Sequence, residues 1–568
     1  MILVRSSRNG VVSRDRVGGQ SLPAIRETKF PDVERSSLGE TTWLAAPVVM
    51  EGLKSSGICG CRRGGTGGGG FCAGHDLKNQ GERQIISSRS LSAGSGLRAS
   101  VRLLSQKPVV PFSSARRLRV AYLVNTPAEQ QQMLDAIGAA SVGDLFEQIP
   151  APLRMERPLA IPPALTELEL EAHLRDLASR NGGVGSRVCF LGGGAYDHFI
   201  PSAVDAIASR SEFYTAYTPY QAEASQGSLQ AFFEYQSLIC QLTGLGVSNA
   251  SLYEGGTAVS EAVFMAMRVS DRHRRVVVLG SVHPQARQVC QTYLNQISCE
   301  LVTVPTPGGV ADVAEVVRQL DDQTACLVIQ SPNYLGCLEQ TRDLCAAARK
   351  VGALAIVSCQ PLSLGLLTRP GDVGADIAVA EGQSLGIPLQ YGGPYLGVLA
   401  CREEYVRKMP GRLIGETVDR EGRRTFVLNL QAREQHIRRD KATSNICTNQ
   451  GLMALRATVF LSLLGPQGLR ETATLCVQKA HYAAARLAAV PGLELVSKSP
   501  FFLEFAIRCR GGAGPVLAKA RAAGFDLGPA LGPEDVPGLS APEECLLVAV
   551  TEQRTKQQID RLADLLAR

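Results

Sequence analysis

Residues 375 to 394 read ADIAVAEGQSLGIPLQYGGP, an apolar run followed by a polar, glycine-rich turn. A short apolar run of this kind is typical of a strand buried on both faces of a parallel sheet. The turn holds Gln383 and Ser384 but no lysine, and the chain has no lysine between Lys350 and Lys408. The stretch therefore predicts an α/β fold and raises the question of which chemistry its turn can support.

Helices and short apolar strands alternate around this stretch for about two hundred residues, which is the pattern of a parallel sheet covered by helices. The expected strands are RRVVVLG, CELVTVP, TACLVIQ, LAIVSCQ, DIAVAEG and YLGVLAC. The expected helices cover residues 228 to 244, 258 to 270, 284 to 297, 310 to 320 and 340 to 352. We assign residues 183 to 451 to this large α/β domain.

Two further ordered regions flank the large domain. Residues 120 to 182 are expected to form a helical arm, because Thr126 and Glu129 make a capping box and residues 165 to 182 read as a second amphipathic helix. Such arms often clasp a partner subunit. Residues 452 to 568 mix a long helix with short strands and predict a smaller α+β domain.

The first 119 residues differ from the rest, because they are rich in Arg, Ser and Gly and lack periodicity. This composition predicts a disordered extension. The abrupt start of regular sequence at Val120 favours the interpretation that the true start of the protein lies near Val120 and that the upstream part is an error of the gene model. A transit peptide is an alternative. Several acidic residues in this segment argue against it, because transit peptides contain few of them. No metal site is expected, since four candidate ligands match no common zinc spacing: Cys59, Cys61, Cys72 and His75.

Composition narrows the class of protein. A length of 568 residues predicts two or three domains, and a net charge of +6 is modest for that length, which argues against nucleic acid as the main partner. The sixteen cysteines include several single ones in apolar segments, so a reduced, cytoplasmic location is expected. No apolar run approaches the roughly 20 residues that span a bilayer, so no membrane is expected.

One glycine-rich motif can bind an anion. In YEGGTAVSEAVFMA, Gly255 and Gly256 precede Thr257 at the expected start of a helix, where backbone N–H groups can hold a phosphate. A tight loop entering a buried helix is the alternative. The position of the motif before the sheet resembles the phosphate loop of aminotransferase-like (type I) pyridoxal phosphate enzymes.

Two other features of type I enzymes are missing. Those enzymes pair the pyridine nitrogen with an Asp after a central strand, whereas LAIVSCQ ends in Ser358, Cys359 and Gln360. The Schiff-base lysine should follow one strand later, where the sequence has Gln383 and Ser384. The fold is therefore expected without the cofactor chemistry.

Several polar strings remain as candidate sites. Asp197 and His198 can form an acid/base pair, but adjacent residues of an extended chain point to opposite sides and structural capping competes with that role. Tyr217 and Tyr220 line a pocket or pack at a subunit contact. The basic run from 433 to 441 binds an anion or an acidic protein, or forms a solvated helix face.

Together these strings closely resemble the glycine dehydrogenase (decarboxylating) family, the P-protein of the glycine cleavage system, and within it the first subunit of the split bacterial form. Ala224 and Glu381 are small departures at positions where relatives vary. The resemblance covers residues 121 to 568 and rests on NTPAEQQQML, GGGAYDHFIP, TAYTPYQAEASQG, NASLYEGGTAVSEA, ADIAVAEGQSLGIP, YGGPYLG, MPGRLIG and REQHIRRDKATSNICTNQ.

The resemblance implies an α2β2 heterotetramer in which glycine dehydrogenase subunit 2 carries the lysine and the pyridoxal phosphate, so that this chain alone binds no cofactor. The complex would decarboxylate glycine, release CO2 and pass the aminomethyl group to the lipoyl arm of the H-protein. The loop from Gly255 to Thr257 would then be a relic. The residues expected to form a shared wall at the partner's cofactor pocket are His198, Tyr217, Thr218, Tyr220 and Gln221.

Two other functions stay open at the level of sequence. The chain can be a non-catalytic structural subunit that only stabilises the partner carrying the cofactor. It can also be an autonomous pyridoxal phosphate enzyme in which another lysine, such as Lys441, serves. The missing lysine disfavours the autonomous enzyme.

Overall fold

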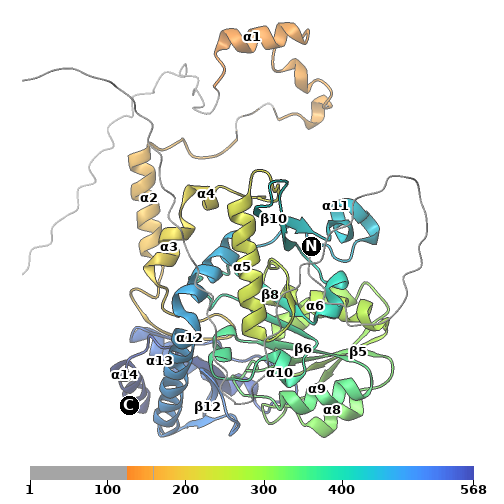
Figure 1. Cartoon of the computed structure of the whole chain (residues 1–568). Coiled ribbons are helices and arrows are strands. Elements are labelled where there is room, and N and C mark those ends of the chain that lie inside the picture. The colour runs from red at the N-terminus through yellow and green to blue at the C-terminus, as the bar shows by residue number, and fades with distance from the viewer. Residues whose placement is uncertain (1–123, 156, 158) are drawn as a thin grey trace, which may run out of the picture. The chain divides into compact units, whose positions relative to one another are not determined.

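The computed structural model describes residues 124 to 568, except 156 and 158 (Figure 1). The described residues divide into two compact units, 124 to 175 and 176 to 568. The expectations for residues 1 to 119, including the cysteine and histidine cluster, fall outside the described part of the chain.

The larger unit is built on a seven-stranded sheet with the strand order β2-β8-β7-β6-β5-β3-β4. The five strands from β3 to β7 run parallel, while β8 is antiparallel to β7 and β2 is antiparallel to β8. Six of these strands were predicted from apolar runs, and β2 was not. Their bounds are β2 Val247–Ser248, β3 Arg275–Leu279, β4 Glu300–Val304, β5 Thr324–Gln330, β6 Leu354–Cys359, β7 Ile377–Glu381 and β8 Gly397–Cys401.

Helices cover both faces of this sheet. Figure 1 shows α6 on one side of the sheet and α8 with α9 on the other. The central strands are apolar on both faces for this reason, and Val277, Ile329 and Val379 are fully buried. The helices of this region are α5 Gln226–Thr243, α6 Gly255–Ser270, α7 Pro284–Leu294, α8 Val313–Gln319, α9 Thr341–Lys350 and α10 Pro370–Val373, with the 3₁₀ helices η3 Pro361–Gly365 and η4 Glu403–Lys408.

The C-terminal part has two small sheets. Strands β11, β12 and β14 form an antiparallel sheet, and β13 pairs in parallel with β1. Strand β1 comes from residues that the sequence assigned to the large domain, so the first strand of the unit joins the C-terminal region. The elements are β1 Val188–Leu191, β11 Leu493–Leu495, β12 Glu504–Cys509, β13 Phe525–Gly528, β14 Cys545–Ala549, α12 Gly451–Ala488, α13 Ala513–Ala522, α14 Lys556–Ala567 and η7 Pro542–Glu544.

Helix α12 links the two parts of the larger unit. Among the described helices it is the one whose length and apolar composition would suffice to cross a membrane. It was not recognised from the sequence as a long apolar run. Half of its apolar window is buried in protein, and α12 contacts α5, α14 and η3. Backbone geometry breaks the helix at Gly465, just before Pro466, because proline has no N–H to continue the ladder. Its burial identifies it as a core helix.

The smaller unit begins with α1 Pro127–Ala136, followed by η1 Asp144–Phe146 and η2 Ala151–Leu153. The predicted capping box is present, since the Thr126 hydroxyl accepts from the Glu129 N–H and the Glu129 carboxylate accepts from the Thr126 N–H. Helix α2, Glu167–Ser179, confirms the second predicted helix. Neither helix buries a residue, and large apolar side chains stay exposed, among them Phe146, Leu153, Leu168 and Leu174.

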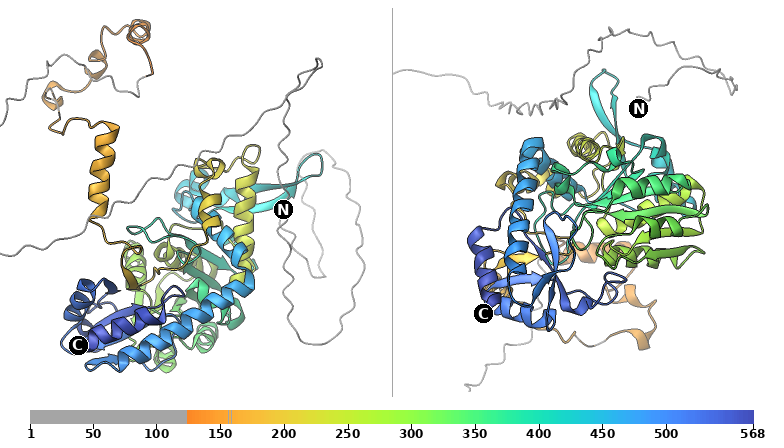
Figure 2. Two further views of the ribbon diagram at one scale, coloured as in Figure 1. Left: turned by 90° about the vertical axis from the view of Figure 1, so that its left-hand side faces the viewer. Right: turned by 90° about the horizontal axis from the view of Figure 1, so that it is seen from below.

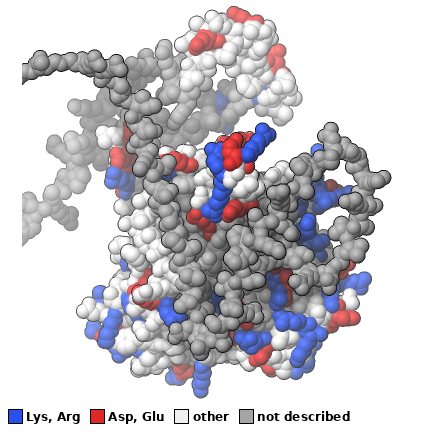
Figure 3. Space-filling model, viewed as in Figure 1, with Lys and Arg blue, Asp and Glu red and all other residues white. Residues whose placement is uncertain are grey.

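A β-hairpin of β9 Leu413–Val418 and β10 Arg424–Asn429 projects from the larger unit (Figure 2). Asp419 and Glu421 at its tip pair with Arg423. Positive and negative side chains are interspersed where coloured residues are visible in Figure 3, so neither sign dominates there. The remaining short helices are α3 Ser202–Ala208, α4 Ser211–Tyr214, η5 Gln431–Arg433, α11 Gln435–Arg438 and η6 Arg439–Lys441.

Candidate functional site

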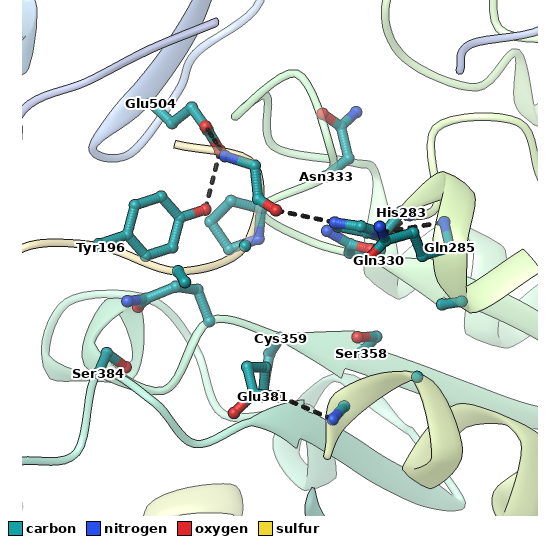
Figure 4. Close-up of a pocket in the computed structure, with 18 of the residues that line it drawn as sticks. Tyr196, His283, Gln285, Gln330, Asn333, Ser358, Cys359, Glu381, Ser384 and Glu504 are labelled. Carbon is teal, nitrogen blue, oxygen red and sulfur yellow. Dashed lines mark hydrogen bonds between the residues drawn. The ribbon is translucent and has the colours of Figure 1, made fainter. Parts of the chain in front are cut away.

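A cavity of about 330 Å³ lies where the carboxyl ends of β5, β6 and β7 face the start of α6 (Figure 4). Open α/β sheets bind their ligands at this edge. The cavity wall contains three glutamates, Glu254, Glu381 and Glu504, together with His283, and it includes no lysine or arginine. An anionic ligand would therefore meet no permanently positive side chain in this wall.

The polar side chain of Gln383, in the turn after β7, bonds to backbone groups of the same chain. The Gln383 side chain accepts a hydrogen bond from the Tyr196 N–H at 2.8 Å and donates to the Tyr196 and Ile387 carbonyls at 3.0 and 2.8 Å. Ser384 faces the cavity, is only 3% exposed, and its hydroxyl oxygen has no hydrogen-bond partner. A serine hydroxyl at this place cannot form a Schiff base.

The end of β6 carries no carboxylate. Cys359 directs its thiol to the Val379 carbonyl, and burial raises the pKa of this thiol to about 12. The Gln360 side-chain oxygen accepts from the Ser363 N–H at 2.8 Å and so caps η3, while its buried amide nitrogen has no partner. None of these groups can keep a pyridine nitrogen protonated as an Asp would.

Backbone N–H groups at the start of α6 donate hydrogen bonds to side chains of the same chain. Glu254 is the N-cap residue, and its carboxylate accepts from the N–H and the hydroxyl of Thr257. Glu381 accepts from the Gly255 N–H at 2.9 Å, and its other carboxylate oxygen accepts from the N–H groups of Gln383 and Leu396 at 2.9 and 3.1 Å. Burial, opposed by these hydrogen bonds, raises the pKa of Glu381 to about 7.

The residues present do not fit pyridoxal phosphate. A serine stands at the place of the lysine, the end of β6 lacks the Asp, and N–H groups of the glycine-rich loop already bind carboxylates. The residues of this cavity therefore do not suffice to hold a phosphorylated cofactor on their own.

His283 forms the wall opposite Glu381 and was not singled out from the sequence. Its Nε2 lies 2.8 Å from the Gly193 carbonyl, and its Nδ1 accepts from the Gln285 N–H at 3.2 Å, so Nε2 carries the proton. Burial lowers the pKa of His283, and the ring packs edge-on against Tyr334 at 4.9 Å. Its position in the short segment between β3 and α7, at the edge where parallel sheets bind their ligands, was the available signal.

Glu504 closes the cavity from the C-terminal part and was also missed. Its carboxylate accepts from the Gly193 N–H at 2.7 Å and from the Tyr196 hydroxyl at 2.8 Å. Burial raises the pKa of Glu504 to about 7. A Cβ at Gly192 would lie 1.8 Å from this carboxylate, which explains the glycine there. No local pattern marks Glu504, because its partners lie more than 300 residues away.

Asp197 and His198 are not an acid/base pair. The Asp197 carboxylate pairs with Arg554 at 2.7 Å, whereas His198 Nδ1 lies 2.7 Å from Glu552. Both side chains therefore fasten their loop to the segment after β14. His198 is buried, so in this structure it lies inside the chain and not on a surface that a partner can reach.

The loop from 215 to 221 presents the other shared-wall candidates. Tyr217 is 84% exposed, and Thr218 and Gln221 are exposed as well. Tyr220 is half-buried, donates its hydroxyl to Asn449 at 2.8 Å, and lies under the Arg412 guanidinium at 4.7 Å. The loop is thus anchored by Tyr220 and the buried Pro219, and is exposed at Tyr217, Thr218 and Gln221.

The basic segment is only partly a solvated face. Arg433 is buried and donates to the Met409 and Gly411 carbonyls, and the neighbouring Glu434 pairs with Arg412. The rest of the segment through Lys441 is exposed. Lys441 lies on η6 and does not line the cavity, so it is not placed to replace the missing lysine.

The cysteines of the described residues are all free, and most of them are buried, among them Cys189, Cys290, Cys326 and Cys345. One buried group of metal-ligating side chains was not expected. His198, Cys476 and Glu552 bring ligand atoms within 4.8 Å of one another. Hydrogen bonds to Glu552 from His198 and from the Cys476 thiol at 3.4 Å explain this group without an ion.

Comparisons with known proteins bear on this arrangement. Residues 120 to 566 match the family described as "Glycine cleavage system P-protein". A relative from Desulforamulus reducens, named "Probable glycine dehydrogenase (decarboxylating) subunit 1", is 49% identical over 446 residues, which are 78% of this chain and 98% of the relative. A relative of the same name from Chlorobium limicola is 49% identical over 451 residues, 78% of this chain and 99% of the relative.

Solved structures agree with this family. A structure described as glycine decarboxylase (P-protein) of the glycine cleavage system, in inhibitor-bound form, matches with a TM-score of 0.73 at 43% identity, over 78% of this chain and 99% of that one. A cysteine desulfurase from Escherichia coli matches with a TM-score of 0.51 at 14% identity, over 69% of this chain and 96% of that one, which bears on the fold alone. The predicted type I fold is confirmed.

Proposed function

Because the chain belongs to the glycine cleavage system P-protein family, we propose that it is the subunit of a glycine-decarboxylating enzyme that works without a cofactor of its own. The names of its relatives, "subunit 1", imply a second subunit. In the proposal this partner carries the lysine and the pyridoxal phosphate, and the two chains form an α2β2 heterotetramer.

One observation carries the proposal. The cavity at the place of a type I cofactor site has Ser384 where the lysine is needed and Glu381 on the start of α6, so it offers neither attachment nor a free anion site. A relative 49% identical over nearly its whole length is nonetheless named as a glycine dehydrogenase subunit. Both facts are explained if the lysine and the pyridoxal phosphate belong to the partner.

In the complex, glycine is decarboxylated and its aminomethyl group passes to the lipoyl arm of the H-protein, with release of CO2. Pyridoxal phosphate supplies the electron sink for the decarboxylation when it is bound by the partner. Reduction of the lipoyl disulfide makes the overall reaction an oxidoreduction.

In the proposed complex, this chain contributes two exposed surfaces that contact the partner. Tyr217, Thr218 and Gln221 are exposed on one loop, and Tyr220 fixes that loop through Asn449 and Arg412. We assign this loop to the wall of the partner's pocket, without the buried His198. The exposed apolar side chains of α1, η1, η2 and α2 fit a partner surface in the same way, because isolated helices with an unburied apolar side need a partner to cover it.

The experiment uses the full chain and a lysine-bearing second subunit. We expect the chain mixed with pyridoxal phosphate to show no absorbance of a Schiff base and no change on addition of borohydride. Mixed with the second subunit and the H-protein, it should restore exchange of bicarbonate with the carboxyl group of glycine. Schiff-base absorbance in this chain alone would contradict the division of labour.

The same experiment separates the structural alternative. If the second subunit exchanged bicarbonate equally well without this chain once it was stabilised by other means, such as an osmolyte, this chain would only hold its partner together. Loss of exchange in a folded second subunit supports a shared active site.

A further inference from the structure

The start of α6 retains the geometry of an anion site. The helix has 16 residues, so its dipole and the N–H groups of its first turn, which have no partner within the helix, favour negative charge at Gly255, Gly256 and Thr257. This end of the helix opens on the cavity, and the two glycines and Glu254 line the cavity wall. A phosphate group would approach here if the position were free.

Glu381 fills that position from the end of β7. Figure 4 shows its side chain turned toward the start of α6, with the bond to the Gly255 N–H drawn. Three backbone N–H groups, from Gly255, Gln383 and Leu396, converge on its carboxylate at 2.9 to 3.1 Å. Such convergence on one anion is the arrangement by which backbone nests hold phosphates.

We propose that the Glu381 carboxylate is a built-in anion that takes the place of a ligand phosphate at the start of α6, so that the cavity rejects phosphate-bearing ligands and admits only uncharged or cationic small molecules. The inference deepens the proposed function and rests on it, because it assigns to one residue the reason why this subunit works without the cofactor.

The space around Glu381 agrees with this role. A Cβ added at Gly255 would lie 2.9 Å from the Glu381 Cβ, so the strand end and the helix start are in close contact. A phosphate cannot reach the Gly255 N–H while the Glu381 side chain is present. Like charge adds to the steric barrier, since Glu254 caps the same helix and the wall offers no lysine or arginine to balance a phosphate.

The cavity still offers groups to a ligand of another class. The Ser384 hydroxyl is buried, faces the cavity and lacks a hydrogen-bond partner, and the Gln360 amide nitrogen, also in the cavity wall, lacks one too. These are neutral groups, which suits a small uncharged or cationic molecule beside three carboxylates. Glu381 thus sets which charge the cavity accepts.

The test titrates inorganic phosphate and pyridoxal phosphate into the full-length chain by calorimetry at about pH 8, because Glu381, whose pKa burial raises to about 7, is then mostly ionised. Glu381→Ser removes the carboxylate and opens its space, and we expect it to bind both ligands at least roughly tenfold more tightly than the wild type, the scale of an anion at a helix start. Glu504→Gln is the matched control, because it removes a buried carboxylate from the same cavity while its hydrogen bonds go to Gly193 and Tyr196. It should bind neither ligand more tightly.

Two results would overturn the inference. One is a folded Glu381→Ser protein, verified by circular dichroism, that gains no affinity for phosphate. The other is an equal gain in Glu504→Gln, which would assign the effect to net charge and not to position. If Glu381→Ser does not fold, Glu381→Ala, which also removes the carboxylate and opens its space, is titrated instead, and absence of any gain there also overturns the inference.

The outcome is separable from the fate of the proposed function. A failed bicarbonate exchange in the reconstituted wild-type complex contradicts the proposed function and leaves the phosphate titrations unaffected. Conversely, a working complex together with an unresponsive Glu381→Ser variant removes only the role given to Glu381.

Discussion

The cavity beside α6 and the loop from 215 to 221 use polar side chains in opposite ways. In the cavity wall Glu381 and Glu504 accept hydrogen bonds from backbone N–H groups of their own chain, and Glu504 is almost fully buried. In the loop, Tyr217 is 84% exposed. The polar groups of the cavity wall thus hold the structure of their own chain together, while the exposed side chains of the loop are available to another molecule.

The difference indicates where function is to be sought in a chain whose cavity residues do not fit pyridoxal phosphate. Substitutions inside should change stability, because buried polar groups left without partners are costly. Substitutions at the exposed positions of the loop, such as Tyr217, should change activity of the complex and leave stability alone. The predictions below run from the largest expected change in the free energy of unfolding to the smallest.

The largest loss is expected for Arg554→Ala. Arg554 pairs with Asp197 at 2.7 Å, and both side chains are nearly buried. Removing one partner leaves a carboxylate in the interior, and such losses run to roughly 3 to 5 kcal/mol. Urea unfolding at neutral pH measures the change. Arg423→Ala is the control, because its pair with Asp419 at the hairpin tip has an exposed arginine, and its unfolding curve should overlay that of the wild type.

A pH-dependent gain is expected for Glu504→Gln. Burial raises the pKa of Glu504 from 4.5 to about 7, so the folded protein binds the proton more tightly than the unfolded chain. This difference stabilises the folded protein fully below pH 4.5, and the stabilisation is lost as the pH rises through 7. The variant has no carboxyl to ionise, so relative to the wild type it should gain roughly 2 to 3 kcal/mol between pH 4.5 and pH 8. Urea midpoints at both pH values test this.

Glu223→Gln, at an exposed position, is the matched control for that titration and should follow the wild type at both pH values. A constant difference between Glu504→Gln and the wild type across the range would contradict the assigned pKa. It would also weaken the contrast between the cavity and the loop, since Glu504 would then ionise as freely as a surface group.

The sequence was informative where the signal is local. Apolar runs located β3 to β8, the absence of lysine near Ser384 was visible directly, and the capping box at Thr126 was predicted from four residues. It was uninformative where partners are distant. Glu504 meets Gly193 across 311 residues and Asp197 meets Arg554 across 357, and no periodicity records such pairs. Strands β1 and β13 were missed for the same reason, since they pair only with each other.

A moderate loss is expected for Tyr220→Phe. The substitution removes the hydroxyl that donates to Asn449 and keeps the ring under Arg412. One half-buried hydrogen bond contributes about 1 kcal/mol. Chemical unfolding of the isolated chain measures this loss, and Tyr220→Ala should lose more because the ring contact goes as well. Equal losses in the two variants would show that the ring does not anchor the loop.

The smallest change in stability, within about 0.5 kcal/mol, is expected for Tyr217→Ala, because an exposed side chain far from strained backbone contributes little to folding. If the loop lines the partner's pocket, bicarbonate exchange by the reconstituted complex should nevertheless fall roughly tenfold, equal to about 1.4 kcal/mol. Val317→Ala, at a half-exposed site on α8, controls for truncation of a surface side chain and should keep full exchange. Full exchange in Tyr217→Ala would remove Tyr217 from the shared wall, and the exposed loop would then need another explanation.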